Sequence, residues 1–248
     1  MTRLSVNINK IALLRNSRGG KIPDPVAVAL DCERFGADGI TVHPRPDARH
    51  IRFNDVRALQ SCLHTELNIE GNPYDPNFMD LVLEVKPHQA TLVPDEPAQI
   101  TSDHGWNLEK HANRLTPLIL QLQEAGIRVS IFIDPEEIHA QRAAQLGVDA
   151  IELYTEAYAK HYVGSIHASQ LLIPYVETAR AAADLGLLVN AGHDLNLANL
   201  GTLHQHIPWL HEVSIGHALV ADALYLGLEN TVRLYSRILH NTSTVGQT

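Results

Sequence analysis

Residues 36–50 read Gly-Ala-Asp-Gly-Ile-Thr-Val-His-Pro-Arg-Pro-Asp-Ala-Arg-His. They contain the unit from which this chain is built. The first glycine of this stretch ends a helical pattern, and a short apolar strand over residues 39–43 begins directly afterwards. Glycine suits a helix C-terminus because it adopts the left-handed conformation that closes the last turn. The same order of glycine and apolar strand returns at Gly126, Gly147 and Gly186. Strands that alternate with helices in this way indicate βαβ units and a parallel sheet.

Eight strands are predicted, and a helical segment follows each one. The strands are expected near residues 4–9, 39–43, 67–70, 89–93, 128–133, 150–154, 187–191 and 213–216. The helices are expected near 24–35, 54–64, 75–85, 107–125, 135–146, 168–185, 196–205, 218–227 and 229–239. Eight βα units in a chain of this length predict a (β/α)₈ TIM barrel that forms one domain over residues 1–248. A doubly wound open sheet is the alternative, but no Gly-x-Gly-x-x-Gly follows the first strand.

The charge pattern bears on the kind of ligand. A net charge of −9 argues against a general nucleic-acid binder. Residues 1–57 nevertheless hold ten of the 19 Lys and Arg but six of the 28 Asp and Glu. A local cationic area on an acidic protein suits a small anionic ligand, although uneven scatter of charges explains the numbers equally well.

The compartment is predicted from the cysteines and from the apolar runs. Cys32 and Cys62 fall in expected helices without the spacing of a metal or redox site, which favours a reducing environment. No run approaches the ~20 apolar residues of a membrane span, and no apolar signal core precedes the first strand. We therefore expect a cytoplasmic protein that binds neither nucleic acid nor membrane.

Side chains alternate across a strand, so one set in each strand faces the barrel axis. The aliphatic set must face the covering helices, which leaves a polar set inside. In six strands this inner set is Ser5, Asn7, Asn9, Gly39, Thr41, His43, Asn68, Glu70, Glu152, Asn190, Ser214 and Gly216. Buried polar groups cost roughly 1–3 kcal/mol each unless they are paired. The pattern predicts a polar pocket at the C-terminal mouth of the barrel, and a self-satisfied interior hydrogen-bond network is the alternative.

Four titratable side chains are expected to meet at that mouth, where barrel enzymes carry out their chemistry. They are His43, Glu70, Glu152 and His193, and imidazoles and buried carboxylates are the usual proton carriers. The same groups could ligate a metal, but no His-x-His closes the first strand and no i, i+4 ligand spacing occurs. No inward strand position is Lys, since Lys10 has the outward parity, so a protein Schiff base has no obvious nucleophile.

Three segments could bind phosphate groups. Gly216 and His217 lie where the last strand turns into a helix, whose N-terminus attracts anions. The loop after the first strand and the loop after the second carry cationic groups, namely Lys10, Arg15, Arg18, Lys21, Arg45, Arg49 and His50. Separate cationic loops favour more than one phosphate. The segment 94–106 lacks periodicity and is long for a connection, which is typical of a lid.

Several short motifs together resemble one known family. They are VNIN (6–9), LRNSRG (14–19), GADGITVH (36–43), RHI (49–51), LNIE (67–70), VNAGH (189–193) and IGH (215–217). In these motifs the chain is similar to the pyridoxine 5′-phosphate synthases. The resemblance implies a TIM barrel with additional helices, assembled as a homo-octamer. It also implies condensation of 3-amino-2-oxopropyl phosphate with 1-deoxy-D-xylulose 5-phosphate to pyridoxine 5′-phosphate, phosphate and water, with no metal and no organic cofactor.

The resemblance also implies roles for individual residues. His43 would accept a proton, Glu70 would act as a second acid or base, His193 would donate a proton, and Glu152 would stabilise a charged intermediate. Arg45, His50 and Thr101 would hold the deoxyxylulose phosphate, and Asn7, Arg18, Gly216 and His217 the amino ketone phosphate. The chain departs from the family pattern at Asn9-Lys10, where Asp-His is common, at Asp194, where Gly is usual, and at Ala221-Asp222, where Gly-Arg is common. We expect Asn9, Lys10 and Asp194 at the substrate site, with Lys10 adding a positive charge.

Two other classes of function remain open on the sequence. A metal-dependent barrel lyase or hydrolase would use the same four titratable residues on a phosphorylated small molecule. A protein that binds phosphorylated ligands without catalysis would share the cationic loops.

Overall fold

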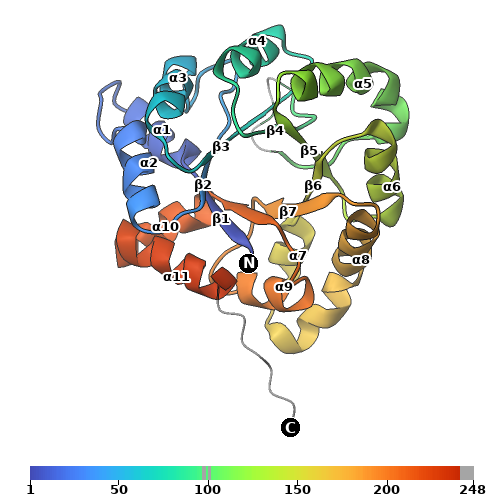
Figure 1. Ribbon diagram of the computed structural model, residues 1–248. Helices are drawn as coiled ribbons and strands as arrows, with labels where there is room; N and C mark the ends of the chain where they lie inside the picture. Colours follow the sequence, from blue (N-terminus) through green and yellow to red (C-terminus); the bar gives the residue numbers. More distant parts are fainter. Residues whose placement is uncertain (97–98, 100–101, 241–248) are drawn as a thin grey trace.

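The computed structural model describes residues 1–96, 99 and 102–240 and contains a closed barrel. Eight parallel strands pair in the order of the sequence, and the last pairs with the first. Figure 1 shows these strands at the centre with the helices around them. The predicted TIM barrel is therefore confirmed, and the open sheet is wrong.

The bounds of the elements agree with the predicted strands to within about two residues, the usual error of such predictions. The strands are β1 Arg3–Asn7, β2 Gly39–Val42, β3 Glu66–Gly71, β4 Gln89–Leu92, β5 Arg128–Ile133, β6 Ala150–Leu153, β7 Leu188–Gly192 and β8 Glu212–Ile215. The helices are α1 Asn9–Asn16, α2 Pro25–Arg34, α3 Phe53–Cys62, α4 Pro76–Val85, α5 Leu108–Glu124, α6 Glu137–Leu146, α7 Glu156–His161, α8 Ser165–Asp184, α9 Leu200–His206, α10 His217–Leu226 and α11 Leu228–His240.

The end of β1 differs from the prediction, because the strand stops at Asn7 and not at residue 9. The side chain of Asn7 accepts a hydrogen bond of 3.0 Å from the backbone N–H of Asn9. An asparagine that binds the backbone two residues ahead makes an Asx-turn, and this turn directs the chain into α1. The sequence analysis missed α1 and α7, which are short and have no side-chain N-cap.

The hydrophobic core lies between the barrel and its helices, as the strand parity predicted. Leu4, Val6, Ile40, Val42 and Ile69 are all buried on the helix side of their strands. The interior is polar instead, and hydrogen bonds link its side chains across the strands: Ser5 to Thr41 (2.6 Å), Thr91 to Asn68 (3.1 Å) and Asn190 to Gln89 (3.4 Å). An interior hydrogen-bond network therefore exists in the middle of the barrel, below the mouth.

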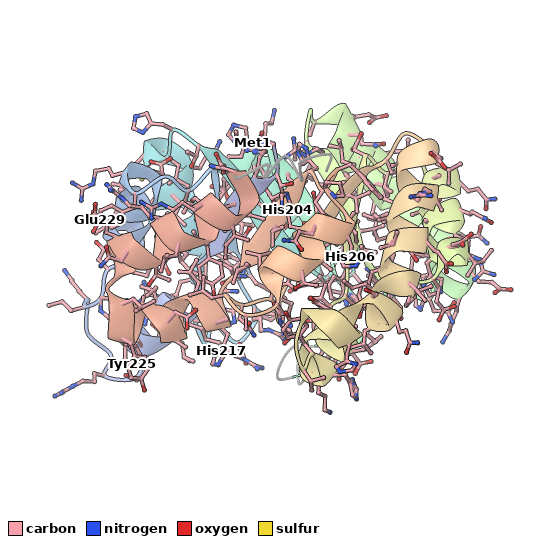
Figure 2. The ribbon with its side chains drawn as sticks, turned by 90° about the horizontal axis from the view of Figure 1, so that it is seen from below. Met1, His204, His206, His217, Tyr225 and Glu229 are labelled. Atoms are coloured by element: carbon pink, nitrogen blue, oxygen red, sulfur yellow. The ribbon has the colours of Figure 1, made fainter. Side chains whose placement is uncertain are left out.

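The additional helices gather at one end of the barrel. α1, α7 and α10 follow β1, β6 and β8 directly, and each precedes a longer helix of the outer ring. Figure 2 shows Met1 and His217, which mark the two ends, on opposite sides of the molecule. Loops and short helices therefore surround the C-terminal mouth. No helix in the described part of the chain is long and apolar enough to cross a bilayer.

Candidate active site

The four predicted proton-transfer residues lie together at the mouth. His43 directly follows β2, Glu70 lies in β3, Glu152 in β6, and His193 directly follows β7. His43 Nδ1 is 3.8 Å from Glu70 Oε2. The charge of Glu152 raises the pKa of Glu70, and the charge of His193 acts on both His43 and Glu152. Side chains from four strands therefore lie close enough at this end of the barrel to act on one another's charge.

His43 and Glu70, the pair joined by the 3.8 Å contact, have pKa values shifted in opposite directions. Burial, together with the positive charge of Arg45, holds the pKa of His43 well below its ordinary value. Burial and the neighbouring Glu152 carboxylate raise the pKa of Glu70 well above its ordinary value. The two shifts favour the neutral form of both groups, an imidazole and a carboxylic acid. A neutral imidazole accepts a proton, and a carboxylic acid donates one.

His193 is positioned by the backbone of the β7 terminus. Gly192 packs so closely on β8 that a Cβ atom there would overlap the carbonyl oxygen of Ser214. His193 itself has a φ of 66°, in the left-handed region that non-glycine residues rarely adopt. Its Nδ1 lies 2.8 Å from Asp194 Oδ2. Burial opposes the charged imidazole, but the hydrogen bond with Asp194 prevails and raises the pKa of His193.

Glu152 lies deeper in the barrel. Burial raises its pKa to about 7, and the carboxylate of Glu212 contributes in the same direction. Glu212 is linked to it through the sheet, because Asn190 in β7 is the Cα partner of both residues. Glu152 therefore titrates near neutral pH, where a small change in its surroundings decides its charge.

Asn7 and Asn9 support the titratable residues. The amide of Asn7 donates to Glu70 Oε2 at 3.4 Å, and Asn9 Oδ1 accepts from the backbone N–H of His43 at 2.9 Å. Gly216 at the end of β8 packs against Asn7, since a Cβ atom on this glycine would come within 3.0 Å of Asn7 Cβ. Asn7 and Asn9 therefore orient Glu70 and His43, and the sequence did not predict these two hydrogen bonds.

The predicted anion-binding groups are only partly assembled. Gly216 and His217 stand at the N-terminus of α10, and His217 is exposed. Lys10 is exposed in the first turn of α1, where its charge contributes to the lowered pKa of His50. Burial is the main cause of that shift, which brings the pKa of His50 to about 4. The rings of His50 and His43 meet edge to face with centroids 6.2 Å apart.

Arg45 is held by partners that the sequence analysis missed. Its guanidinium binds the carboxylate of Asp95 and donates to the carbonyl oxygen of Gln99 at 2.8 Å. Ser102 also donates to Asp95, at 2.8 Å. Asp95 Oδ1 is buried and has no hydrogen-bond partner among the described residues. Arg45 therefore joins the loop after β2 to the segment 94–106, whose lack of helical or strand structure agrees with the prediction for its described residues.

Arg15, Arg18 and Thr101, which were predicted near the phosphates, differ in their surroundings. Arg15 lies in α1 and makes an ion pair with Asp55 at 2.6 Å, where both side chains are mostly buried. All three of its guanidinium nitrogens donate, to Asp55, Asn16 and the carbonyl oxygen of His50, so Arg15 is not free to bind a phosphate and the predicted cationic loop is wrong at this residue. Arg18 is exposed, and no described residue is its hydrogen-bond or ion-pair partner. Thr101 lies outside the described residues.

Replacing Arg15 by Ala is expected to lower the free energy of unfolding by about 3 kcal/mol, because it leaves the Asp55 carboxylate without its buried partner. Urea denaturation followed by circular dichroism measures this loss. Arg34→Ala is the matched control, since Arg34 makes an exposed pair with Asp31 and its loss should cost below about 1 kcal/mol. Equal losses in the two variants would contradict a structural role for Arg15.

An apolar group at the mouth was also missed. Val93, Phe132 and Tyr154 form a small cluster separate from the main core. Phe132 has the parity of the inward Ser130, but the run Val-Ser-Ile-Phe-Ile over residues 129–133 is apolar on both faces and hides this fact. Only the position of Ser130 in that run signals which face is inside.

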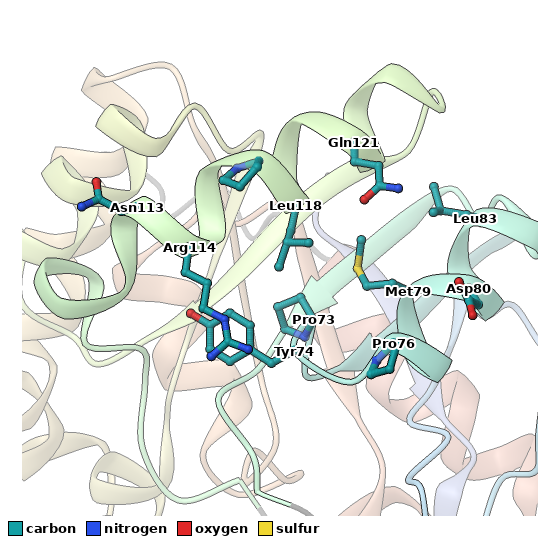
Figure 3. A pocket seen from close by; sticks show the side chains of 11 residues that line it. Pro73, Tyr74, Pro76, Met79, Asp80, Leu83, Asn113, Arg114, Leu118 and Gln121 are labelled. Atoms are coloured by element: carbon teal, nitrogen blue, oxygen red, sulfur yellow. The ribbon is translucent and has the colours of Figure 1, made fainter.

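A groove of about 710 Å³ lies outside the barrel, between α4 and α5. Figure 3 shows its lining, in which the guanidinium of Arg114 covers the ring of Tyr74 at 3.6 Å from the centroid. None of the four titratable mouth residues lines it. Within residues 1–96, 99 and 102–240, no three His, Cys, Asp or Glu side chains are grouped as a metal site requires.

Known proteins of two kinds are similar to this chain. Curated proteins named pyridoxine 5′-phosphate synthase include one from Bacteroides fragilis, 57% identical over 239 residues that cover 96% of this chain and 100% of the relative. One from Cytophaga hutchinsonii is 56% identical and covers 96% of this chain and 99% of its own. Among solved structures, phosphoribosyl anthranilate isomerase from Thermotoga maritima matches with a TM-score of 0.60 and 17% identity, over 96% of this chain and 98% of that chain. At that identity the structural match supports the barrel fold alone.

A family model agrees with these relatives. The model described as pyridoxal phosphate biosynthesis protein PdxJ matches residues 4–241, almost the whole chain. With a match of that extent and relatives above half identity, the chain belongs to the PdxJ family of pyridoxal phosphate biosynthesis proteins.

Proposed function

We propose that this protein is a pyridoxine 5′-phosphate synthase. It condenses 3-amino-2-oxopropyl phosphate with 1-deoxy-D-xylulose 5-phosphate and releases pyridoxine 5′-phosphate, phosphate and water. The observation that carries the proposal is the acid–base set at the mouth, where His43 Nδ1 lies 3.8 Å from Glu70 Oε2. Burial lowers the pKa of His43 and raises that of Glu70, and the hydrogen bond with Asp194 raises the pKa of His193 against the effect of burial. The curated relatives carry this name, which gives the product, and the two substrates follow from the family.

The proposed reaction needs these groups because it consists mainly of proton transfers. The amino ketone brings its own amine, so no lysine is required to form an imine. The later steps remove water and phosphate, and each needs a proton acceptor and a proton donor close to the same carbon chain. His43 takes protons from carbon or nitrogen, His193 and Glu70 give protons to leaving oxygen atoms, and Glu152 balances positive charge on the intermediate.

The two phosphates occupy opposite sides of the mouth in this proposal. Gly216 and His217 bind the amino ketone phosphate, because they stand at the start of α10 and the backbone N–H groups of a helix N-terminus attract an anion. A short extra helix after the last strand is a recurrent phosphate site in TIM barrels. Arg45 and His50, with Lys10 near them, bind the deoxyxylulose phosphate. Asn7 and Arg18 complete the first site, and Asn9, Thr101 and Asp194 contact substrates near the acid–base groups.

The test is to mix the pure protein with both phosphorylated substrates and EDTA and to follow product and phosphate release. Turnover that EDTA leaves unchanged supports the proposal. Activity that EDTA abolishes and zinc restores would point to a metal-dependent lyase or hydrolase instead. Binding of both substrates without turnover would point to a non-catalytic phosphate-binding protein.

Replacing Arg45 by Ala is expected to raise KM for 1-deoxy-D-xylulose 5-phosphate by about 10- to 100-fold, the scale of one hydrogen bond to a charged group. KM for the amino ketone should change little. Steady-state kinetics with each substrate varied in turn measure both values. Arg142→Ala is the control, because Arg142 pairs with Glu109 on the outer helices. An equal rise for both substrates would contradict the assignment.

We also propose a homo-octamer in the cytoplasm, as the family resemblance implies. Both cysteines are free thiols, which suits a reducing compartment. Native mass spectrometry measures the subunit number, and a species other than eight subunits would contradict this part of the proposal.

A further inference from the structure

Three apolar side chains lie inside the barrel apart from the main core. Val93 follows β4, Phe132 lies in β5 and Tyr154 follows β6. The ring centroids of Phe132 and Tyr154 are 5.4 Å apart. The aliphatic residues between barrel and helices form a continuous core to which this cluster does not belong. We call Val93, Phe132 and Tyr154 the apolar wall.

The apolar wall lies at the C-terminal ends of β4, β5 and β6, the end of the barrel that carries the acid–base groups. Phe132 is the Cα partner of Glu152. The backbone N–H of Val93 donates to the carbonyl oxygen of Gly71, the residue after Glu70. The interior below the wall is polar, with Thr91 under Val93 and Ser130 under Phe132 on the same strands. The wall therefore belongs to the mouth and does not continue a hydrophobic interior.

The wall gives the mouth two unlike sides. Its residues come from three consecutive strands, β4 to β6, whereas Asn7, His43, Glu70 and His193 come from β1, β2, β3 and β7. Glu152 also lies in β6, two residues before Tyr154. In the closed order of the strands, β4, β5 and β6 lie opposite β8, β1 and β2, and β3 and β7 flank them (Figure 1). The Tyr154 hydroxyl donates to Glu156 Oε2 at 2.7 Å, so the wall offers mainly its carbon atoms to a molecule bound above Glu152.

The proposed substrates contain one group that suits such a surface, and this step rests on the proposed function. The two molecules carry phosphate, hydroxyl, carbonyl and amine groups along almost their whole length. The exception is the methyl group at C1 of the deoxy sugar. A hydroxyl group at the same carbon would lose its water against the wall without gaining a hydrogen-bond partner, which is unfavourable. We propose that the apolar wall contacts this methyl group and selects a ketose phosphate that lacks a hydroxyl group at C1.

The experiment compares 1-deoxy-D-xylulose 5-phosphate with D-xylulose 5-phosphate, which differs by the C1 hydroxyl. The ratio of the competitive inhibition constant of the second compound to KM of the first measures discrimination. We expect a ratio of about 100 for the unchanged protein, the usual limit for rejecting an added hydroxyl. Val93→Thr keeps the shape but offers a hydroxyl partner, so the ratio should fall about tenfold. Phe132→Leu makes room for the hydroxyl and should lower the ratio by a similar factor.

Val129→Thr is the matched control, because Val129 is buried on the helix side of β5 and cannot contact a ligand in the mouth. It should lower Tm and leave the ratio unchanged. A ratio that stays the same in both wall variants, or a ratio near one in the unchanged protein, would overturn the inference. Absence of any turnover by the unchanged protein would instead overturn the proposed function, so the two failures are distinguishable.

Discussion

Replacing Glu70 by Gln is expected to lower kcat by ~10²-fold or more, the scale of general acid–base catalysis, with little change in either KM. Glutamine keeps the size of the side chain and a carbonyl oxygen that accepts from the amide of Asn7. An amide neither releases nor takes up a proton at the pH values where a carboxyl group does. Steady-state kinetics with both substrates at saturation measure the loss.

Glu66→Gln provides the matched control for this change. Glu66 lies in the same strand with the same inward parity, but at the opposite end of the barrel. It binds Arg3 at 2.6 Å and also binds Arg128, and these hydrogen bonds outweigh burial and lower its pKa to about 2. We expect Glu66→Gln to reduce stability and to leave kcat nearly unchanged. An equal loss of kcat in the two variants, or a loss confined to KM after Glu70→Gln, would contradict the catalytic role.

The contrast between Glu70 and Glu66 shows what the sequence could predict. Alternation along β3 places both carboxylates inside, and the direction of a parallel strand places only Glu70 at the mouth. The glycines at 36, 126, 147 and 186 all have positive φ, as the predicted helix ends require. These predictions succeed because local rules decide them: the two-residue period of a strand and the freedom of glycine.

The missed features depend on contacts between distant parts of the chain. Arg15 looks like a solvent-facing cation until α3 brings Asp55, 40 residues later, against it. Arg45 looks free until the segment after β4 brings Asp95 to it. Both pairings depend on loop conformations, and no periodic pattern encodes these. A sequence therefore locates the ends of strands better than it locates the partners of the charges beyond them.

The mouth also explains how one small site can hold both proton donors and acceptors at neutral pH. Burial disfavours charge on every group, so it lowers the pKa of His43 and raises that of Glu70. His193 escapes this rule because Asp194 accepts a hydrogen bond from its ring. The aspartate that departs from the family pattern thus has a physical effect, since it raises the pKa of one imidazole while burial lowers that of the other.

This effect leads to the second large expected change. Replacing His193 by Gln should lower kcat by ~10²-fold, because the proposed proton donor is lost. Asp194→Asn keeps the imidazole but weakens its hydrogen-bond acceptor, so the pKa of His193 should fall. A donor must be protonated to act, and therefore the alkaline limb of the kcat/KM profile should move to lower pH. Profiles measured across the neutral range test this shift.

The raised pKa of His193 also determines how the stability of the Asp194→Asn variant depends on pH. A histidine whose pKa is raised on folding stabilises the folded state fully below its unfolded pKa, and this contribution disappears as pH rises through the folded pKa. The variant should therefore be less stable than the parent at a pH below the ordinary histidine pKa of about 6.5, and the difference should shrink at alkaline pH. Glu33→Gln is the control, because Glu33 faces His64 far from the mouth and should not move the kcat/KM profile. An alkaline limb that stays in place in Asp194→Asn would assign proton donation to a group other than His193.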